Sequence, residues 1–157
     1  MSENATTETK PSQPQFAIQK LYVKDASLEV PAAPQVFQGP WKPKVQLDVN
    51  TSASKIGEDL HEVVLRLVVT ASQEEKSQLL IEVSQAGIFL CRGMAPEQLR
   101  TVLGTLCPDA LFPYARECVD NMAVRAGFPP FGLAPMNFEA LFRHAMEQQQ
   151  QAQAQKH

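Results

Sequence analysis

The chain has 157 residues, 44% of them hydrophobic, and a formal net charge of −3. This length suits one domain and this apolar share can build a core, which excludes an intrinsically disordered protein. The 14 Lys and Arg residues are scattered, so the chain lacks the basic face that nucleic-acid binding requires. No apolar run reaches the ~20 residues of a membrane-spanning helix, and no basic start followed by an apolar run marks a signal peptide. We therefore expect neither a nucleic-acid partner nor direct membrane insertion.

The two ends differ in composition from the middle. Residues 1–15 hold no hydrophobic cluster and are predicted to form a disordered tail, whereas residues 147–157 are a Gln- and Ala-rich tract, typical of a solvated tail. One folded domain is therefore expected over residues 16–146.

Alternating apolar and polar residues predict four β-strands in the first part of this domain. The predicted strands are residues 16–30, 45–50, 60–71 and 79–90. In the third strand every odd position from Val63 to Ala71 is apolar, which predicts one apolar face. The short polar turn at residues 73–76 implies that the third and fourth strands are antiparallel.

The first predicted strand alternates imperfectly. Phe16, Ile18 and Tyr22 fall on even positions and are assigned to one face, which leaves Leu21 and Val23 as exceptions on the other. The strand ends at a segment with four prolines, residues 31–43. Because prolines fix the backbone without forming a ladder, this segment is interpreted as a stiff crossing loop.

The apolar period becomes helical in the second part of the chain. We predict a helix that starts at Pro96, is broken or kinked by Pro108, continues from Pro113 and ends at Gly127 as its C-cap. Asn137 is expected to cap the last helix. Strands followed by helices predict an α+β domain, a four-stranded antiparallel sheet with helices packed on one face.

The sequence contains no motif that would indicate an enzyme. It has no Gly-rich phosphate loop, no nucleophile elbow and no His-Glu-x-x-His helix. The isolated histidines, interpreted as surface residues, are His61, His144 and His157. The cysteines, interpreted as buried free thiols of a reducing compartment, are Cys91, Cys107 and Cys118. No catalytic residue, metal site or cofactor is predicted.

Two apolar features exceed what a simple core needs. The crossing loop carries Phe37 and Trp41, and the last helix carries Phe138, Leu141 and Phe142. Each set has two interpretations, because it can pack on its own core or form a wall of an open apolar groove.

An acidic group is predicted on the polar face of the first and fourth strands. Asp25 and Glu29 share a face of the first strand, and Leu80 and Glu82 share one of the fourth. The group is interpreted either as an ordinary solvated face or as an acidic docking patch with an apolar centre, suited to a basic partner.

Five segments resemble the SecB chaperone family, with matching order and spacing across about residues 16–146. They are residues 22–37, 61–72, 87–89, 111–117 and 133–142. The resemblance implies a homotetramer, a dimer of dimers, that catalyses no reaction. It also implies that the protein binds unfolded precursor proteins in the cytoplasm, keeps them translocation-competent and delivers them to the translocase ATPase SecA. The family's acidic C-terminal tail is replaced here by a Gln-rich one.

The resemblance also assigns site residues. It places SecA binding on the acidic sheet face, at Asp25, Glu29, Leu80 and Glu82. It places the substrate groove between the crossing loop and the last helix, at Phe37, Trp41, Val45, Leu47, Phe138, Leu141 and Phe142. Two alternatives stay open: a SecB-like chaperone devoted to one client such as an antitoxin, and a small oligomeric α+β enzyme. The enzyme would need converging acid, base or nucleophile groups, and the sequence suggests none.

Overall fold

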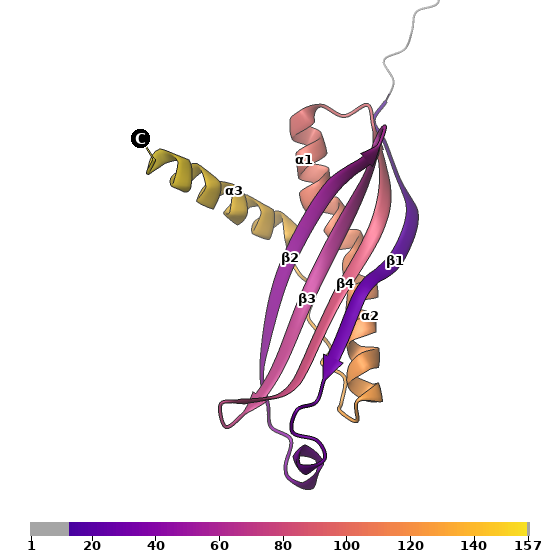
Figure 1. Cartoon of the computed structure of the whole chain (residues 1–157). Helices are drawn as coiled ribbons and strands as arrows, with labels where there is room; N and C mark the ends of the chain where they lie inside the picture. The colour runs from indigo at the N-terminus through magenta and orange to yellow at the C-terminus, as the bar shows by residue number, and fades with distance from the viewer. Residues whose placement is uncertain (1–12, 157) are drawn as a thin grey trace, which may run out of the picture.

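The computed structural model describes residues 13–156 (Figure 1), so most of the tail predicted for residues 1–15 lies outside the described residues. The strands are β1 (Gln15–Glu29), β2 (Lys44–Gly57), β3 (Leu60–Gln73) and β4 (Lys76–Arg92). They form one antiparallel sheet in the order β1-β4-β3-β2, and a 3-10 turn, η1 (Gln35–Gln38), lies in the crossing loop. The helices are α1 (Pro96–Gly104), α2 (Leu106–Arg125) and α3 (Phe138–Ala154).

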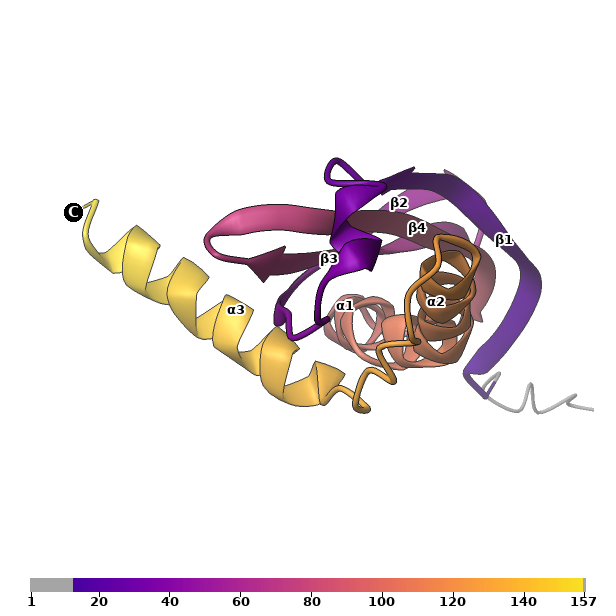
Figure 2. The same ribbon diagram turned by 90° about the horizontal axis from the view of Figure 1, so that it is seen from below.

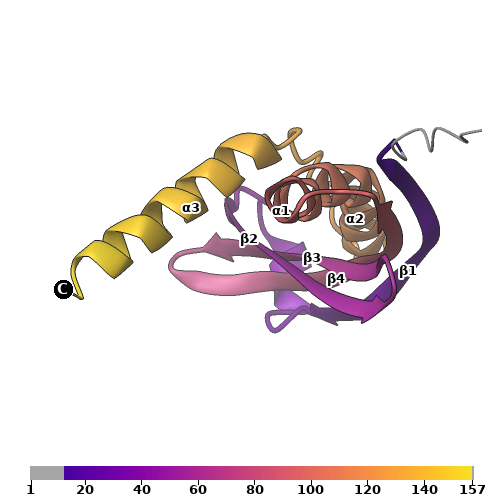
Figure 3. The same ribbon diagram turned by 90° about the horizontal axis from the view of Figure 1, so that it is seen from above.

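The sheet is covered by helices on one side. Views from the two ends of the sheet (Figures 2 and 3) show α1 and α2 against one face, here called the inner face, and no helix of residues 13–156 against the outer face. The predicted α+β architecture, a four-stranded antiparallel sheet with helices packed on one face, is confirmed.

The core lies between the middle of the sheet and α2. Every odd position of β3 from Val63 to Ala71, the predicted apolar face, has no exposed surface, and α2 covers this row with Leu111, Ala115 and Val119. Each fully buried Val or Leu side chain contributes about 1.5–3 kcal/mol relative to an exposed one. The two central strands therefore anchor the domain, and the edge strands β1 and β2 carry the surfaces that remain open.

Two bulges change the phase of β1. Its pairing with β4 is irregular just after Ile18 and again just after Val23. An extra residue at each point moves the following side chains to the opposite face. As a result Tyr22 lies opposite Ala86 on the outer face, whereas Leu21 lies on the inner face. The assignment of Tyr22 to the same face as Ile18 is therefore wrong.

The edge strand β2 is longer than predicted, because it continues past Asn50 to Gly57. Residues 51–55 lack the apolar alternation that would mark a strand. Their extended form is imposed by the ladder with β3, in which Thr51 lies opposite Leu65. The pairing becomes irregular only between Lys55 and Gly57.

The helical region is divided at a different residue from the predicted one. The break between α1 and α2 lies at Thr105, and Pro108 belongs to the first turn of α2, where its missing N–H needs no partner. Pro113 does not begin a helix but lies inside α2, on its exposed side, where solvent can reach the carbonyl group that loses its donor. No helix within residues 13–156 has both the length and the apolar character to cross a membrane.

The C-terminus of α2 is closed by a Schellman motif. Gly127 has φ of +93°, and its N–H donates to the carbonyl of Val124 at 3.0 Å. The N–H of Phe128 donates to the carbonyl of Ala123 at 2.9 Å. The helix ends at the predicted glycine, with Ala126 as the C-cap residue and Gly127 in the position directly after it.

A short linker then directs the chain into α3. The Asp120 carboxylate accepts hydrogen bonds from the N–H groups of Phe131, at 2.9 Å, and Gly132, at 3.3 Å. Asn137 is the N-cap, as predicted, and its side-chain oxygen accepts a hydrogen bond from the N–H of Ala140 at 3.0 Å.

α3 leaves the body of the domain on the side of β2 (Figures 2 and 3). The Gln-rich segment predicted as a solvated tail is exposed, and it continues α3 as helix up to Ala154. Among residues 13–156, the first turns of α3 line cavities together with other elements and its later residues are exposed, so the helix forms one open wall beside the edge of the sheet.

Candidate functional site

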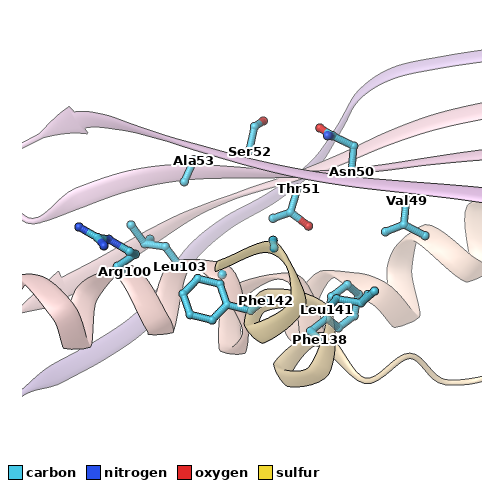
Figure 4. Close-up of a pocket in the computed structure, with 12 residues that line it drawn as sticks. Val49, Asn50, Thr51, Ser52, Ala53, Arg100, Leu103, Phe138, Leu141 and Phe142 are labelled. Atoms are coloured by element: carbon cyan, nitrogen blue, oxygen red, sulfur yellow. The ribbon is translucent and has the colours of Figure 1, made fainter. Parts of the chain in front are cut away.

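An apolar groove separates the inner side of β2 from the first turns of α3 (Figure 4). Its cavity has a volume of about 450 Å³. Val49, Thr51 and Ala53 point from β2 toward the helices, whereas the intervening side chains point away. The α1 side of the cavity is closed by Leu103. The groove is open because α1 and α2 cover mainly the centre of the sheet and leave the inner side of β2 only partly covered.

The apolar row of β2 extends beyond this cavity. Val45 and Leu47 lie opposite Ala71 and Val69 of β3, which are buried, so both belong to the inner face. Val45 is exposed and Leu47 half-buried. Together with Val49 they form a continuous apolar row along the edge strand.

The crossing loop contributes a separate aromatic cluster at the end of α2. The Phe37 and Phe128 rings lie 5.1 Å apart between centroids, and the Trp41 and Phe128 rings lie 4.6 Å apart. Phe37 is 50% exposed, and Trp41 is half-buried. This cluster can present aromatic surface while its base is fixed on a buried residue.

The seven predicted groove residues therefore occupy three neighbouring positions. Phe37 and Trp41 form the aromatic cluster, Val45 and Leu47 lie in the β2 row, and Phe138, Leu141 and Phe142 line the cavity. Among them, Phe138 is only 4% exposed and packs against Phe112, with ring centroids 6.1 Å apart, so it mainly anchors α3.

Sequence reasoning missed several residues that complete the cavity. They are Val49, Asn50, Thr51, Ser52, Ala53, Arg100, Leu103, Gly104 and Ala145. The alternation that marks Val45 and Leu47 also marks Val49, so that residue could have been found. The others could not, because their place in the groove depends on where the linker brings α3.

The outer face brings the predicted acidic group together. In the β1–β4 register, Ser27 lies opposite Glu82 and Glu29 lies opposite Leu80, while Asp25 is two positions before Ser27 on the same face. Leu80 is half-buried between the acidic side chains of the two strands. The geometry matches the predicted patch of carboxylates around an apolar centre.

One of these carboxylates is paired within the chain. Glu82 forms an ion pair with Arg66 of β3, whose guanidinium also donates a hydrogen bond from Nε. Asp25 and Glu29 are exposed and belong to none of the ion pairs within residues 13–156. Their charges are therefore available to a partner, although solvent and salt screen them.

A second polar cluster, which the sequence analysis does not predict, lies on the outer face around Glu62. Tyr22 donates a hydrogen bond from its hydroxyl to Glu62, and Lys24 Nζ lies 2.7 Å from the other carboxylate oxygen. Burial, and then the bond to Glu62, raises the pKa of Tyr22 to about 12. The bonds from Lys24 and Tyr22 lower the pKa of Glu62. This cluster ties β1 to β3 across β4.

His61 is buried, which contradicts its interpretation as a surface residue. It is 7% exposed, and its Nδ1 atom has no hydrogen-bond partner among the residues described. Burial lowers the pKa of His61, Lys55 lowers it further, and Asp59 acts in the opposite direction. His144 is exposed on α3, as predicted, and His157 lies outside the described residues. The sequence did contain a sign that His61 is buried, because it occupies an odd position of β3, like the buried row from Val63 to Ala71.

The cysteines carry no site of their own. All three are free; Cys91 and Cys107 are buried, as predicted, and Cys118 is partly buried. Burial raises the pKa of each thiol, which makes the thiolate scarce and the sulfur unreactive. Within residues 13–156, no three His, Cys, Asp or Glu side chains are grouped closely enough to hold a metal ion.

Comparisons with known proteins agree with this fold. The family described as Preprotein translocase subunit SecB matches residues 9–149. The chain is 48% identical over 154 residues to the Protein-export protein SecB of Hahella chejuensis, covering 98% of this chain and 95% of that protein. A solved structure of a SecB-like chaperone from Mycobacterium tuberculosis, in complex with a peptide from the antitoxin HigA1, superposes with a TM-score of 0.64 at 20% identity, covering 77% of this chain and 90% of that one.

The chain therefore has a SecB-like fold, in which a four-stranded antiparallel sheet carries its helices on one face. The family model matches nearly the whole chain, and the relative from Hahella chejuensis is 48% identical to it, so the family can be assigned. The chain belongs to the SecB family of protein-export chaperones.

Proposed function

We propose that this chain binds unfolded precursor proteins in the cytoplasm, keeps them translocation-competent and delivers them to SecA, and that it catalyses no reaction and uses no cofactor. The observation that carries the proposal is the open apolar groove between β2 and α3, continued by the β2 row toward the aromatic cluster at Phe37 and Trp41. A folded domain gains nothing in stability by leaving these surfaces uncovered, whereas a chaperone needs them.

The groove suits a client without a defined sequence. Hydrophobic burial is non-directional, so many apolar segments can use one surface. Burying ~1,000 Å² of apolar surface would contribute about 25 kcal/mol before costs. Ordering a flexible client and the groove side chains offsets most of that, so binding can be tight and still reversible. Because binding holds the client by mass action, ATP is not required.

The outer face supports delivery to a basic partner. Asp25, Glu29, Leu80 and Glu82 lie together on the side of the sheet opposite the helices, so the partner and the client would not compete for one surface. Charge complementarity would speed the encounter and fix the orientation of the complex, and its contribution should fall as ionic strength rises.

Two features support assembly into a homotetramer, a dimer of dimers. β1 forms a long free edge of the sheet, and α2 exposes the large apolar side chains Leu106, Tyr114 and Val124. Contacts through such surfaces would place several grooves on one particle, and linked grooves raise the avidity for a single long client without new contacts.

Mass measurement in solution, with and without a denatured polypeptide, tests the proposal. The expected result is a tetramer that gains the mass of the client. A monomer that ignores denatured polypeptides would contradict it. A pull-down from cells then separates the general from the dedicated chaperone, since many co-purified precursors support export, and one partner such as an antitoxin supports a dedicated role.

A further inference from the structure

The first turns of α3 are held against the end of α1 by an aromatic ring. Phe142 lies over Gly104, the last residue of α1, so closely that a Cβ atom built on Gly104 would lie 2.7 Å from Phe142 Cε2 and closer still to Cδ2. Real Cβ atoms essentially never approach a neighbour at such distances. The absence of a side chain at position 104 is therefore what allows the ring to occupy this place.

The backbone gives no other reason for a glycine here. The residues with φ in the left-handed region are others, and Gly104 is not among them. A glycine at a helical position destabilises the helix relative to alanine. Because Gly104 has neither the C-cap conformation nor a turn to make, its contact with Phe142 is the feature that a substitution would disturb.

The position of the Phe142 ring shapes the groove. Phe142 lines both the cavity of about 450 Å³ on the β2 side and a second cavity of about 330 Å³, and it is the one residue that their linings share; the second lining includes Thr101, Thr105 and Met146. The ring is thus a partition between two spaces. Gly104 borders only the first of them.

We propose that Gly104 is a specificity-determining residue, because it fixes the Phe142 partition and so keeps the cavity beside β2 open to a bulky apolar side chain of the client. This inference rests on the proposed client-binding function. With the ring on Gly104, Leu141 and Phe142 face Val49 across the cavity, so an aromatic or long aliphatic side chain finds apolar surface on both sides. A methyl group at position 104 displaces the ring and changes this space.

Gly104→Ala and Phe142→Ala, alone and combined, test the inference, with Gly39→Ala as the matched control. Gly39 has extended backbone, and a Cβ there would meet no atom within 4 Å. Alanine is a better helix former than glycine, so α1 itself should not unfold in Gly104→Ala. The measurements are hydrogen exchange of residues 138–146, and affinities for two unfolded peptides that differ in having Phe or Ala at the same positions.

In Gly104→Ala we expect faster exchange of residues 138–146 and a roughly tenfold loss of preference for the Phe peptide, within the range over which contacting residues couple. In the Phe142→Ala background the Gly104 substitution should add little to either effect. A purely structural role would lower both peptide affinities equally and leave the preference unchanged, which would overturn the inference. Wild-type protein that binds neither peptide would instead reject the proposed function, and the inference with it.

Discussion

Arg66 of β3 and Glu82 of β4 form an ion pair on the outer face of the sheet. This pair sits at the edge of the acidic group, so Glu82 is held in position by one cation, while Asp25 and Glu29 on β1 form no ion pair with any residue from 13 to 156. A basic partner that approaches this face meets an ordered carboxylate rather than a mobile one.

Glu82→Lys is expected to lower SecA affinity by roughly two orders of magnitude, because it replaces attraction by repulsion and sets a second cation beside Arg66. Binding titration against SecA at low and high salt measures the effect. Glu58→Lys, an exposed charge reversal at the β2–β3 turn, is the control and should leave the affinity unchanged. Wild-type affinity in Glu82→Lys would remove the acidic face from the docking site.

The double substitution Trp41→Ala and Phe142→Ala should weaken client binding by roughly tenfold or more, since buried aromatic anchors dominate such interfaces. The two rings lie in different parts of the apolar surface, so a client that spans both loses contacts at each. Aggregation suppression of a denatured protein measures the loss. Undiminished suppression by the double variant would show that clients bind elsewhere.

His61→Leu should reduce the acid sensitivity of the fold. The pKa of His61 is lowered from 6.5 in the folded chain, so the unfolded chain takes up a proton first. The stability from this neutral histidine is therefore present above about pH 6.5 and lost as the pH falls below it. Urea unfolding above pH 7 and at about pH 5 should show a smaller difference for the variant. The exposed residue His144, changed to Leu, should keep the wild-type difference.

Tyr22→Phe should remove the tyrosine ionisation with a pKa of about 12 from the alkaline titration of the protein. Because the folded pKa of Tyr22 is about 12, above 10.0 for a free tyrosine, its stabilising effect is present below pH 10.0 and lost as the pH rises toward 12. Tyrosinate absorbance measures it, with the exposed Tyr114→Phe for comparison. At neutral pH the lost hydrogen bond to Glu62 should cost about 1–2 kcal/mol. Loss of a component near pH 10 in Tyr22→Phe would contradict the assignment.

The sequence predicted the face of a residue correctly where the alternation of apolar residues matched the strand pairing, and incorrectly where the pairing contained a bulge. The row from Val63 to Ala71 alternates without interruption, and its burial follows directly. In β1 the bulges after Ile18 and Val23 arise from pairing with β4, so the phase of Tyr22 could not be read from alternation.

The groove was predictable only in its own apolar side chains. Leu141 and Phe142 fall on the apolar stripe of a helix, which marks them from the sequence alone. Gly104 has no side chain to reveal its role, and its contact with Phe142 exists only because the linker sets the direction of α3. The acidic face was found because no bulge interrupts β1 between Asp25 and Glu29.

The carboxylate of Asp120 has a mechanical consequence for the last helix. By binding the N–H groups of Phe131 and Gly132, it fastens the exit from α2 within a few residues of the start of α3. These two hydrogen bonds restrict the linker, so the direction in which α3 leaves the domain is fixed. A force that a captured chain exerts on α3 is therefore transmitted to α2 and the buried centre of the sheet both through the Asp120 carboxylate and through the contact of Phe138 with Phe112.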